Sequence, residues 1–357
     1  MLTAGTSAHA DSPTTECSTT IEVPYATAAA EVMQNIRATF YLPERHLYAH
    51  SLSDRRPDFM WGNGVMFSAL VGATRHGPNA YRPMLDDFFD AIDAYWDRHA
   101  EKNPGYEPSP TAGDSHDKYY DDNAWMVLTF CEAYELTRDA RYLNRARQTL
   151  AFVLTGWDEQ AGGGIWWHEQ HKDGSKNTCV NAPAALGCLR LAQFEDADRA
   201  KQLTAQAQKL IDWTTRTLQD PHDGLYHDRI TVATGQVIRG KLTYNTGLMI
   251  RASLAMYRAS GNDAFLHEAQ RSARACDWFL DKQTGAYSDS VKFSHLLVEA
   301  DLDLYRTTHE PYLLHRAQQN AVYWYQHWKQ SPPPTLIDNA SIARMLWLMA
   351  DAERSEK

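Results

Sequence analysis

Apolar residues recur at the three- and four-residue spacing of amphipathic α-helices along almost the whole chain. Strands are not convincingly indicated, and only the stretches that begin at Gly162 and Gly224 are suited to short hairpins. The pattern therefore predicts an all-α protein. It predicts twelve helices, near residues 25–41, 64–75, 80–99, 120–136, 139–156, 180–194, 197–218, 243–260, 262–281, 289–306, 309–329 and 336–353.

The connections between these helices alternate in length. Short turns join helices near residues 137–140, 195–197, 260–263 and 308–310. Longer loops lie near residues 42–63, 100–119, 157–179 and 219–242. If the helices alternate up and down, all the long loops emerge at one end of the molecule.

A weak internal repeat supports paired helices. Three tyrosines each precede a turn and are followed twelve positions later by an alanine: Tyr134 by Ala146, Tyr257 by Ala269 and Tyr305 by Ala317. Twelve helices arranged as six hairpins predict a closed toroid, an (α/α)6 barrel. The alternative is an open helical solenoid, which would normally show a sharper repeat. We see no linker that would divide the chain, so residues 23–357 are predicted to form one domain.

Composition and charge narrow the class of partner. The chain has 357 residues, with 35 Lys and Arg against 45 Asp and Glu, which gives a net charge of −10. That balance argues against nucleic acid as a partner, because phosphate contacts need clustered cations. No apolar run reaches the roughly 18 residues that span a bilayer. Five cysteines without a paired spacing suggest neither a zinc site nor a disulfide framework, and no cofactor or metal is expected.

The N-terminal residues 1–22 are small and polar, and they lack the basic start and apolar stretch of a complete signal peptide. We interpret them as a disordered tail or as the remnant of a trimmed secretion signal. A secreted, periplasmic or cell-surface location is therefore favoured, and a cytoplasmic location is the alternative.

The long loops are rich in Gly, Asn, Asp, Trp and Tyr, and each leads into the start of a helix. They contain "WGNG" at 61–64, "HDKYYDD" at 116–122, "GGGIWWHEQHKDGSKNTCVNAPAA" at 162–185, "DGLYHD" at 223–228 and "KLTYNTG" at 241–247. If the long loops share one end, these side chains converge on one rim. A concave rim lined by aromatic residues and a few polar groups is the usual form of a ligand site.

Asp121 and Asp122 lie in that rim, in the first turn of a predicted helix. Aspartates at such a position often only cap the helix and interact with its dipole. The adjacent pair Asp86 and Asp87 provides a comparison, because it lies within an amphipathic helix and is expected on a solvated face. Asp121 and Asp122 differ because aromatic residues frame them, and an enclosed carboxylate pair acquires unequal pKa values. One acid and one nucleophile are what glycoside cleavage requires.

The motif "YYDDNAW", followed by "GGGIWW", "NAPAA", "GLYHD" and "TYNTG", resembles glycoside hydrolase family 76. The similarity extends from about Trp61 to beyond Tyr305. This family comprises α-1,6-mannanases and mannosidases, with fungal relatives in cell-wall assembly. The resemblance implies an (α/α)6 barrel and retaining, double-displacement hydrolysis of α-1,6-linked mannan, with Asp121 as nucleophile and Asp122 as acid/base. It also implies that α-mannan or a manno-oligosaccharide is the partner; we expect a monomer.

The sequence departs from the family pattern in two places. Met126 stands where a second tryptophan is common, and residues 287–296 read "YSDSVKFSHL" where a Lys-Gly stretch is expected. These departures leave the aspartate pair unchanged but affect the expected walls of the substrate subsites.

Ten further residues are candidates for substrate binding: Trp61, Asn63, Tyr119, Tyr120, Trp166, Trp167, Lys176, Asp228, Tyr244 and Asn245. Each has a structural alternative. One of Trp166 and Trp167 is expected to pack in the core and the other to contact the sugar. The alternative role of Asn245 is to cap a helix, and the alternative for Lys176 is that it is only a solvated side chain. His168 and nearby His171 lack the partners that would complete a metal site.

Two other functions stay open from the sequence. One is a different toroid enzyme of the sugar 2-epimerase type, which relies on histidines in the cavity. The other is a non-hydrolytic mannan-binding or cell-wall transglycosylation protein. Neither the choice between endo and exo attack nor the exact mannan follows from the sequence.

Overall fold

The computed structural model describes residues 23–100, 102–110 and 117–355. Within these residues there are twelve α-helices, so the predicted all-α class and the number of helices are confirmed. The predicted tail, residues 1–22, lies outside the described residues. The helices are α1 Tyr25–Phe40, α2 Met60–His76, α3 Pro78–Ala91, α4 Tyr120–Thr137, α5 Ala140–Leu154, α6 Thr178–Ala192, α7 Ala197–Leu218, α8 Thr243–Ser260, α9 Asp263–Ala275, α10 Val291–Thr308, α11 Pro311–Gln330 and α12 Leu336–Ser355.

The remaining elements are short and lie between the helices. They are the 3-10 helices η1 Ile92–Tyr95, η2 Gln160–Gly162 and η3 Cys276–Phe279 and the strands β1 Tyr41–Leu42, β2 Leu47–Tyr48, β3 Ser175–Asn177, β4 His227–Thr231 and β5 Gln236–Lys241. Strands β4 and β5 form the hairpin predicted after Gly224, and β3 pairs with β4. The stretch after Gly162 contributes only isolated bridges, such as Trp166 with Lys176, so a hairpin confined to that stretch was a wrong prediction.

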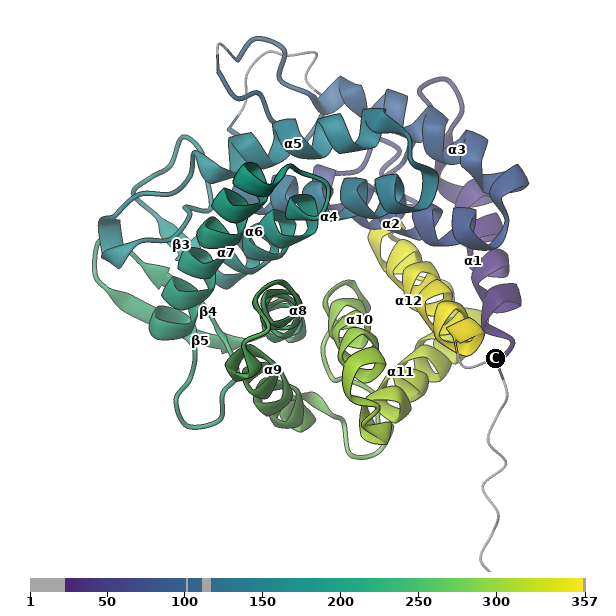
Figure 1. Ribbon diagram of the computed structural model, residues 1–357. Coiled ribbons are helices and arrows are strands. Elements are labelled where there is room, and N and C mark those ends of the chain that lie inside the picture. Colours follow the sequence, from purple (N-terminus) through teal and green to yellow (C-terminus); the bar gives the residue numbers. More distant parts are fainter. Residues whose placement is uncertain (1–22, 101, 111–116, 356–357) are drawn as a thin grey trace, which may run out of the picture.

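The helices form two concentric layers (Figure 1). The even-numbered helices contact one another in the order α2, α4, α6, α8, α10, α12, and α12 also contacts α2. Each odd-numbered helix packs on the outside of this inner layer, with α3 on α2, α5 on α4, α7 on α6, α9 on α8 and α11 on α10. The sixth pair joins the two ends of the described chain, because α1 packs against α12.

The inner helices are buried almost all round, which explains their sequences. In α4, for example, eleven of eighteen residues are buried, including Asn123 and Glu132 as well as the apolar side chains. A helix that contacts neighbours on several faces loses the clear amphipathic pattern of a surface helix. Close approach requires small residues in places: a Cβ on Gly247 of α8 would lie 3.0 Å from the backbone of Leu296 and Leu297 in α10.

The tyrosine repeat seen in the sequence marks the ends of three inner helices. The residue after each helix has a left-handed conformation and donates its backbone N–H to the carbonyl of the repeated tyrosine: Arg138 to Tyr134, Gly261 to Tyr257 and His309 to Tyr305. This αL cap ends the helix and turns the chain into the short connection. The predicted helix–turn–helix unit is therefore confirmed for these three pairs.

A second repeat fixes the long loops. The fourth residue of three inner helices accepts a hydrogen bond from a buried backbone N–H of the preceding loop: Asn123 from Tyr106, Asn181 from Ile165 and Thr246 from Tyr226. These side chains satisfy loop backbone that has entered the core. They explain the asparagines of "DDNAW" and "VNAPAA", and they hold the long loops at the end where inner helices begin, as predicted.

Across residues 23–100, 102–110 and 117–355, no helix combines the length and the apolar character that crossing a bilayer requires.

Candidate active site

Asp121 and Asp122 occupy the first turn of α4, at the end of the inner layer where the long loops gather. Both side chains keep partial exposure, although protein atoms surround them densely. The backbone N–H of Asp122 donates to Oδ1 of Asp121 at 3.0 Å, so the pair is locally linked. Tyr119 is the N-cap residue and provides no side-chain cap, and the positive end of the helix dipole lies at the pair.

The loop after α5 brings a tryptophan to the first of these carboxylates. The carbonyl of Trp167 accepts the backbone N–H of Tyr120 at 3.0 Å, which fixes the loop against the start of α4. The indole N–H of Trp167 then donates to Oδ2 of Asp121 at 2.9 Å. The thiol of Cys179, in the first turn of α6, lies 3.5 Å from the same oxygen.

The two carboxyl groups consequently differ in proton affinity. Burial raises the pKa of Asp121, but the donors from Trp167, Asp122 and Cys179 oppose that shift. Burial raises the pKa of Asp122 well above its usual value, and the neighbouring Asp121 charge raises it further. No described residue donates a hydrogen bond to the Asp122 carboxyl group. The pKa of Asp121 is still raised, but less strongly than that of Asp122, so Asp122 is the member more disposed to hold a proton.

The comparison pair behaves differently. Asp86 and Asp87 lie in the outer helix α3, where Asp87 is exposed and Asp86 pairs with Arg82 and Arg141. Their acidic face belongs to the outer surface, as the sequence predicted, and the Asp87 side chain is 62% exposed. Adjacent aspartates alone therefore do not define the site.

An aromatic wall stands at the same end of the inner layer. We use this name for Trp61 of α2, Phe293 of α10, Tyr244 of α8 and Trp125 of α4, which are all partly exposed. The rings of Trp61 and Phe293 stack at 5.6 Å, those of Phe293 and Tyr244 stack at 4.9 Å, and Trp125 lies 6.3 Å from Tyr244. The Lys292 ammonium lies 5.3 Å from the centre of the Phe293 ring.

Phe293 and Trp125 were not among the predicted binding residues. Phe293 lies in the stretch "YSDSVKFSHL" that departs from the family pattern, and it is the third residue of α10. Trp61 and Tyr244 are each the second residue of an inner helix. Three of the four members of the wall therefore lie in the first turn of an inner helix, and only for Tyr244 did the predicted helix bounds show this.

Five of the predicted binding residues are partly exposed at this rim: Trp61, Tyr119, Trp167, Asp228 and Tyr244. Tyr119 packs edge-on against Trp167 with ring centres 5.3 Å apart. Asp228 lies close enough for its charge to raise the pKa of both Cys179 and Tyr244. The structure therefore brings these residues together around the aspartate pair.

The other five predicted residues are fully enclosed: Asn63, Tyr120, Trp166, Lys176 and Asn245 are each at most 1% exposed. A side chain so enclosed has no surface for a sugar, so we correct these predictions to supporting roles. The Trp166 indole donates to Asp158 at 2.7 Å, and the Lys176 ammonium binds the same carboxylate at 2.6 Å. The amide of Asn245 is buried without a partner among the described residues and is not a cap.

Histidine and cysteine chemistry does not build a metal centre in the described part of the chain. His168 bonds to Asp117 at 2.7 Å and packs on Tyr119. Across residues 23–100, 102–110 and 117–355, no group of three or more His, Cys, Asp or Glu is arranged to hold an ion. The described cysteines, Cys131, Cys179, Cys188 and Cys276, are buried free thiols.

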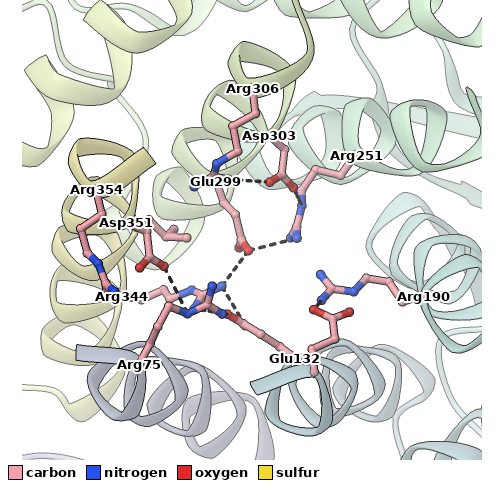
Figure 2. Close-up of a pocket in the computed structure, with 12 residues that line it drawn as sticks. Arg75, Glu132, Arg190, Arg251, Glu299, Asp303, Arg306, Arg344, Asp351 and Arg354 are labelled. Carbon is pink, nitrogen blue, oxygen red and sulfur yellow. Dashed lines mark hydrogen bonds and ion pairs between the residues drawn. The ribbon is translucent and has the colours of Figure 1, made fainter. Parts of the chain in front are cut away.

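The opposite end of the inner layer is closed by ion pairs. A cavity of about 470 Å³ there is lined by six arginines and five acidic residues from all six inner helices, and Figure 2 shows Arg344, Glu299 and Arg251 facing one another across it. Arg344 of α12 bonds to Glu132 of α4 at 2.9 Å and to Glu299 of α10 at 2.8 Å. Arg251 of α8 pairs with Glu299 at 3.0 Å. We call these four residues the ionic floor; it lies away from the aspartate pair.

In this protein, a ring of inner helices holds two carboxyl groups of unequal pKa beside an aromatic wall. This arrangement places it in the class of helical glycoside hydrolases. Comparison with protein families agrees with this class. The model of glycosyl hydrolase family 76 matches residues 24–331, and the chain belongs to that family. A search of curated proteins found no match.

Solved structures share the fold over most of their length. A family 76 α-mannanase of Bacteroides thetaiotaomicron has a TM-score of 0.86 at 25% identity, covering 94% of this chain and 97% of that one. A family 76 mannosidase of the same organism has a TM-score of 0.82 at 21% identity, covering 93% and 100%.

A third structure carries a ligand. It is an inactive variant of an α-1,6-mannanase of Salegentibacter sp., with two adjacent aspartates replaced by asparagine, in complex with α-1,6-mannotriose. Its TM-score is 0.78 at 21% identity, covering 92% of this chain and 99% of that one. At this identity the likeness shows the fold.

Proposed function

We propose that the protein is a retaining glycoside hydrolase that cleaves α-1,6-mannosidic linkages in mannan by double displacement. The observation that carries this proposal is the unequal pair: Trp167 and Cys179 donate hydrogen bonds to Asp121, whereas Asp122 has no donor among the described residues and burial beside the Asp121 charge raises its pKa. Family membership and the mannan-degrading enzymes of similar structure support the choice of substrate.

In the proposed mechanism, Asp121 attacks the anomeric carbon and forms a covalent glycosyl-enzyme. Asp122 donates its proton to the departing glycosidic oxygen, then removes a proton from the water that hydrolyses the intermediate. Retaining enzymes need the two carboxyl groups roughly 5–5.5 Å apart, whereas inverting enzymes need a wider separation. Neighbouring side chains in one helical turn fit the shorter separation better. The two carboxyl groups suffice for this chemistry.

The scaffold proposed for this reaction is a closed (α/α)6 barrel. The contact of α12 with α2 supports closure, because an open solenoid would leave its first and last inner helices apart. A closed ring brings the first turns of α2, α4, α8 and α10 to one rim, where the aromatic wall stands beside the pair.

The aromatic wall is proposed to bind mannose rings, since flat aromatic faces pack against the C–H surfaces of sugars. Its members come from four helices, so it forms an extended surface suited to more than one residue of a mannan chain. We also propose that the protein acts as a monomer and outside the cytoplasm, where a polymeric substrate is accessible.

Hydrolysis of linear α-1,6-mannan oligosaccharides followed by proton NMR tests the proposal. The first-formed reducing end should be the α-anomer, and a β-anomer would overturn the retaining mechanism. The lengths of the first products distinguish endo from exo attack. Tight mannan binding without turnover by the intact protein would instead identify a non-hydrolytic binding protein.

A further inference from the structure

Asp121 is held by a thiol as well as by an indole. Cys179 is the second residue of α6 and only 5% exposed, and its Sγ lies 3.5 Å from Oδ2 of Asp121. A thiol is a weak donor, and its larger sulfur atom lengthens a normal contact. The glycosidase chemistry proposed above needs no thiol, so the position of Cys179 calls for a separate explanation.

The sulfur also has a hydroxyl neighbour. The hydroxyl of Tyr244, in the first turn of α8, lies close enough to Cys179 for each group to affect the pKa of the other. Each of these two groups has a single hydrogen. If Tyr244 donates to sulfur, the thiol hydrogen is free to point at Asp121. The hydrogen bonds then run from Tyr244 to Cys179 to Asp121 and cross three neighbouring inner helices, α8, α6 and α4.

The thiol remains a donor under working conditions. Burial raises the pKa of Cys179 well above its usual value, and the carboxylates of Asp121 and Asp228 raise it further. A thiol in this environment is protonated throughout the range in which a carboxylate nucleophile acts. It therefore serves as a hydrogen-bond donor and not as a nucleophile.

We propose that Cys179 is a positioning residue for Asp121, whose carboxylate it orients and stabilises through an S–H bond directed by the Tyr244 hydroxyl. The inference rests on the proposed function, since it assumes that ionised Asp121 is the working form. Together with Trp167, the thiol places two donors on Oδ2. These donors favour Asp121 over Asp122 as the ionised member of the pair.

The same helix contains a matched control. Cys188 lies nine residues further along α6, is completely buried and is also a free thiol. Its hydrogen-bond partners do not include a carboxylate among the described residues. Replacing it removes a buried sulfur from the same helix without touching the aspartate pair.

The experiment measures kcat/KM against pH on an α-1,6-manno-oligosaccharide for wild type, Cys179→Ala, Cys179→Ser and Cys188→Ala. Loss of the donor should move the acidic limb of Cys179→Ala to higher pH by about 0.5 to 1 unit, with the change in kcat and not in KM. Cys179→Ser should recover part of the shift, because its hydroxyl is a donor. Cys188→Ala should keep the wild-type limb.

An acidic limb that is identical in Cys179→Ala and wild type would overturn the inference, as would an equal shift in Cys188→Ala. If Cys179→Ala does not fold, Tyr244→Phe provides the test, because it removes the directing hydroxyl and should shift the limb in the same direction by a smaller amount. The proposed function fails separately, when wild-type protein does not hydrolyse the oligosaccharide at all.

Discussion

The indole N–H of Trp167 donates a 2.9 Å hydrogen bond to Asp121, whereas the adjacent Asp122 receives no such bond from the described residues. Two carboxyl groups that share one helical turn therefore have different environments. A donor favours the charged form of its acceptor, and burial without a donor favours the neutral form. This difference supplies a nucleophile and an acid from chemically identical side chains.

The first prediction concerns the pair itself. Asp121→Asn should lower the rate of mannan hydrolysis by several orders of magnitude, because an amide does not form the glycosyl-enzyme. Asp122→Asn should lose as much on mannan but retain the first step on an activated aryl mannoside, whose leaving group needs no proton. Steady-state kinetics on both substrates measure this, with circular dichroism to show that the helices remain.

The second adjacent pair provides the control for this test. Asp87→Asn changes an exposed carboxylate on α3 and should leave both activities at the wild-type level. The role assignment is wrong if Asp121→Asn retains activity on the aryl mannoside, or if Asp122→Asn retains full activity on mannan.

A second prediction follows from the indole. Trp167→Phe keeps an aromatic ring but removes the donor to Asp121. The pKa of Asp121 should therefore rise, and since the ionised form is the active one, the acidic limb of kcat/KM should move to higher pH by about one unit. Activity at alkaline pH should change less than activity at acidic pH.

Trp166→Phe is the matched control for this profile. It removes a neighbouring indole whose N–H donates to Asp158, away from the pair. That variant should lose stability and keep the wild-type acidic limb. Equal shifts in the two variants would show that the loop as a whole, and not the single hydrogen bond, sets the profile.

Much of this arrangement was predictable from the sequence. Helical periodicity located all twelve helices, and the alternation of short and long connections placed the motif-bearing loops at one end. Motif composition did not reveal which polar and aromatic residues face the rim. Asn63, Lys176 and Trp166 lie within rim motifs but satisfy buried groups, because loops that enter the core need partners for their backbone and charges. Phe293 was missed because residues 287–296 departed from the expected pattern.

The third prediction tests the aromatic wall. Phe293→Ala removes the central ring between Trp61 and Tyr244 and should raise KM for longer manno-oligosaccharides several-fold while changing kcat less. Trp278→Ala is the control, because Trp278 is 61% exposed and lies outside the wall. Equal increases of KM in both variants, measured on a series of chain lengths, would argue against the wall as a specific sugar surface.

The fourth prediction concerns the loop clamp. Asn123 accepts the N–H of Tyr106 at 2.7 Å and donates to the carbonyls of Tyr106 and Tyr119 at 2.9 and 2.8 Å. Asn123→Ala leaves these buried groups unpaired and should lower the free energy of unfolding by about 2–4 kcal/mol. Urea unfolding measures this. Asn144→Ala, at an exposed position of α5, should change it by less than about 0.5 kcal/mol.

The last prediction concerns the ionic floor in Figure 2, where Arg344 lies between Glu132 and Glu299. Arg251 and Arg344 oppose the effect of burial and lower the pKa of Glu299 to about 2. A lowered carboxylate pKa contributes stability above the unfolded value, near 4.3, and this contribution is lost as pH falls toward 2.

Arg344→Met removes the cation shared by two buried carboxylates and leaves Glu299 with Arg251 and Glu132 with Arg75 as the remaining partners. It should lower the free energy of unfolding at pH 7 by up to about 3–5 kcal/mol. As pH falls from about 5 to 3, protonation removes the ion-pair contribution to the free energy of unfolding of the wild type, and this contribution is smaller in the variant. The difference in free energy of unfolding between the two proteins should therefore narrow. Urea midpoints at several pH values measure this difference. Arg56→Met, which breaks only an exposed pair with Asp54, should show no measurable difference at any of them. A constant difference for Arg344→Met across this range would mean that lost packing, and not lost charge pairing, causes the destabilisation.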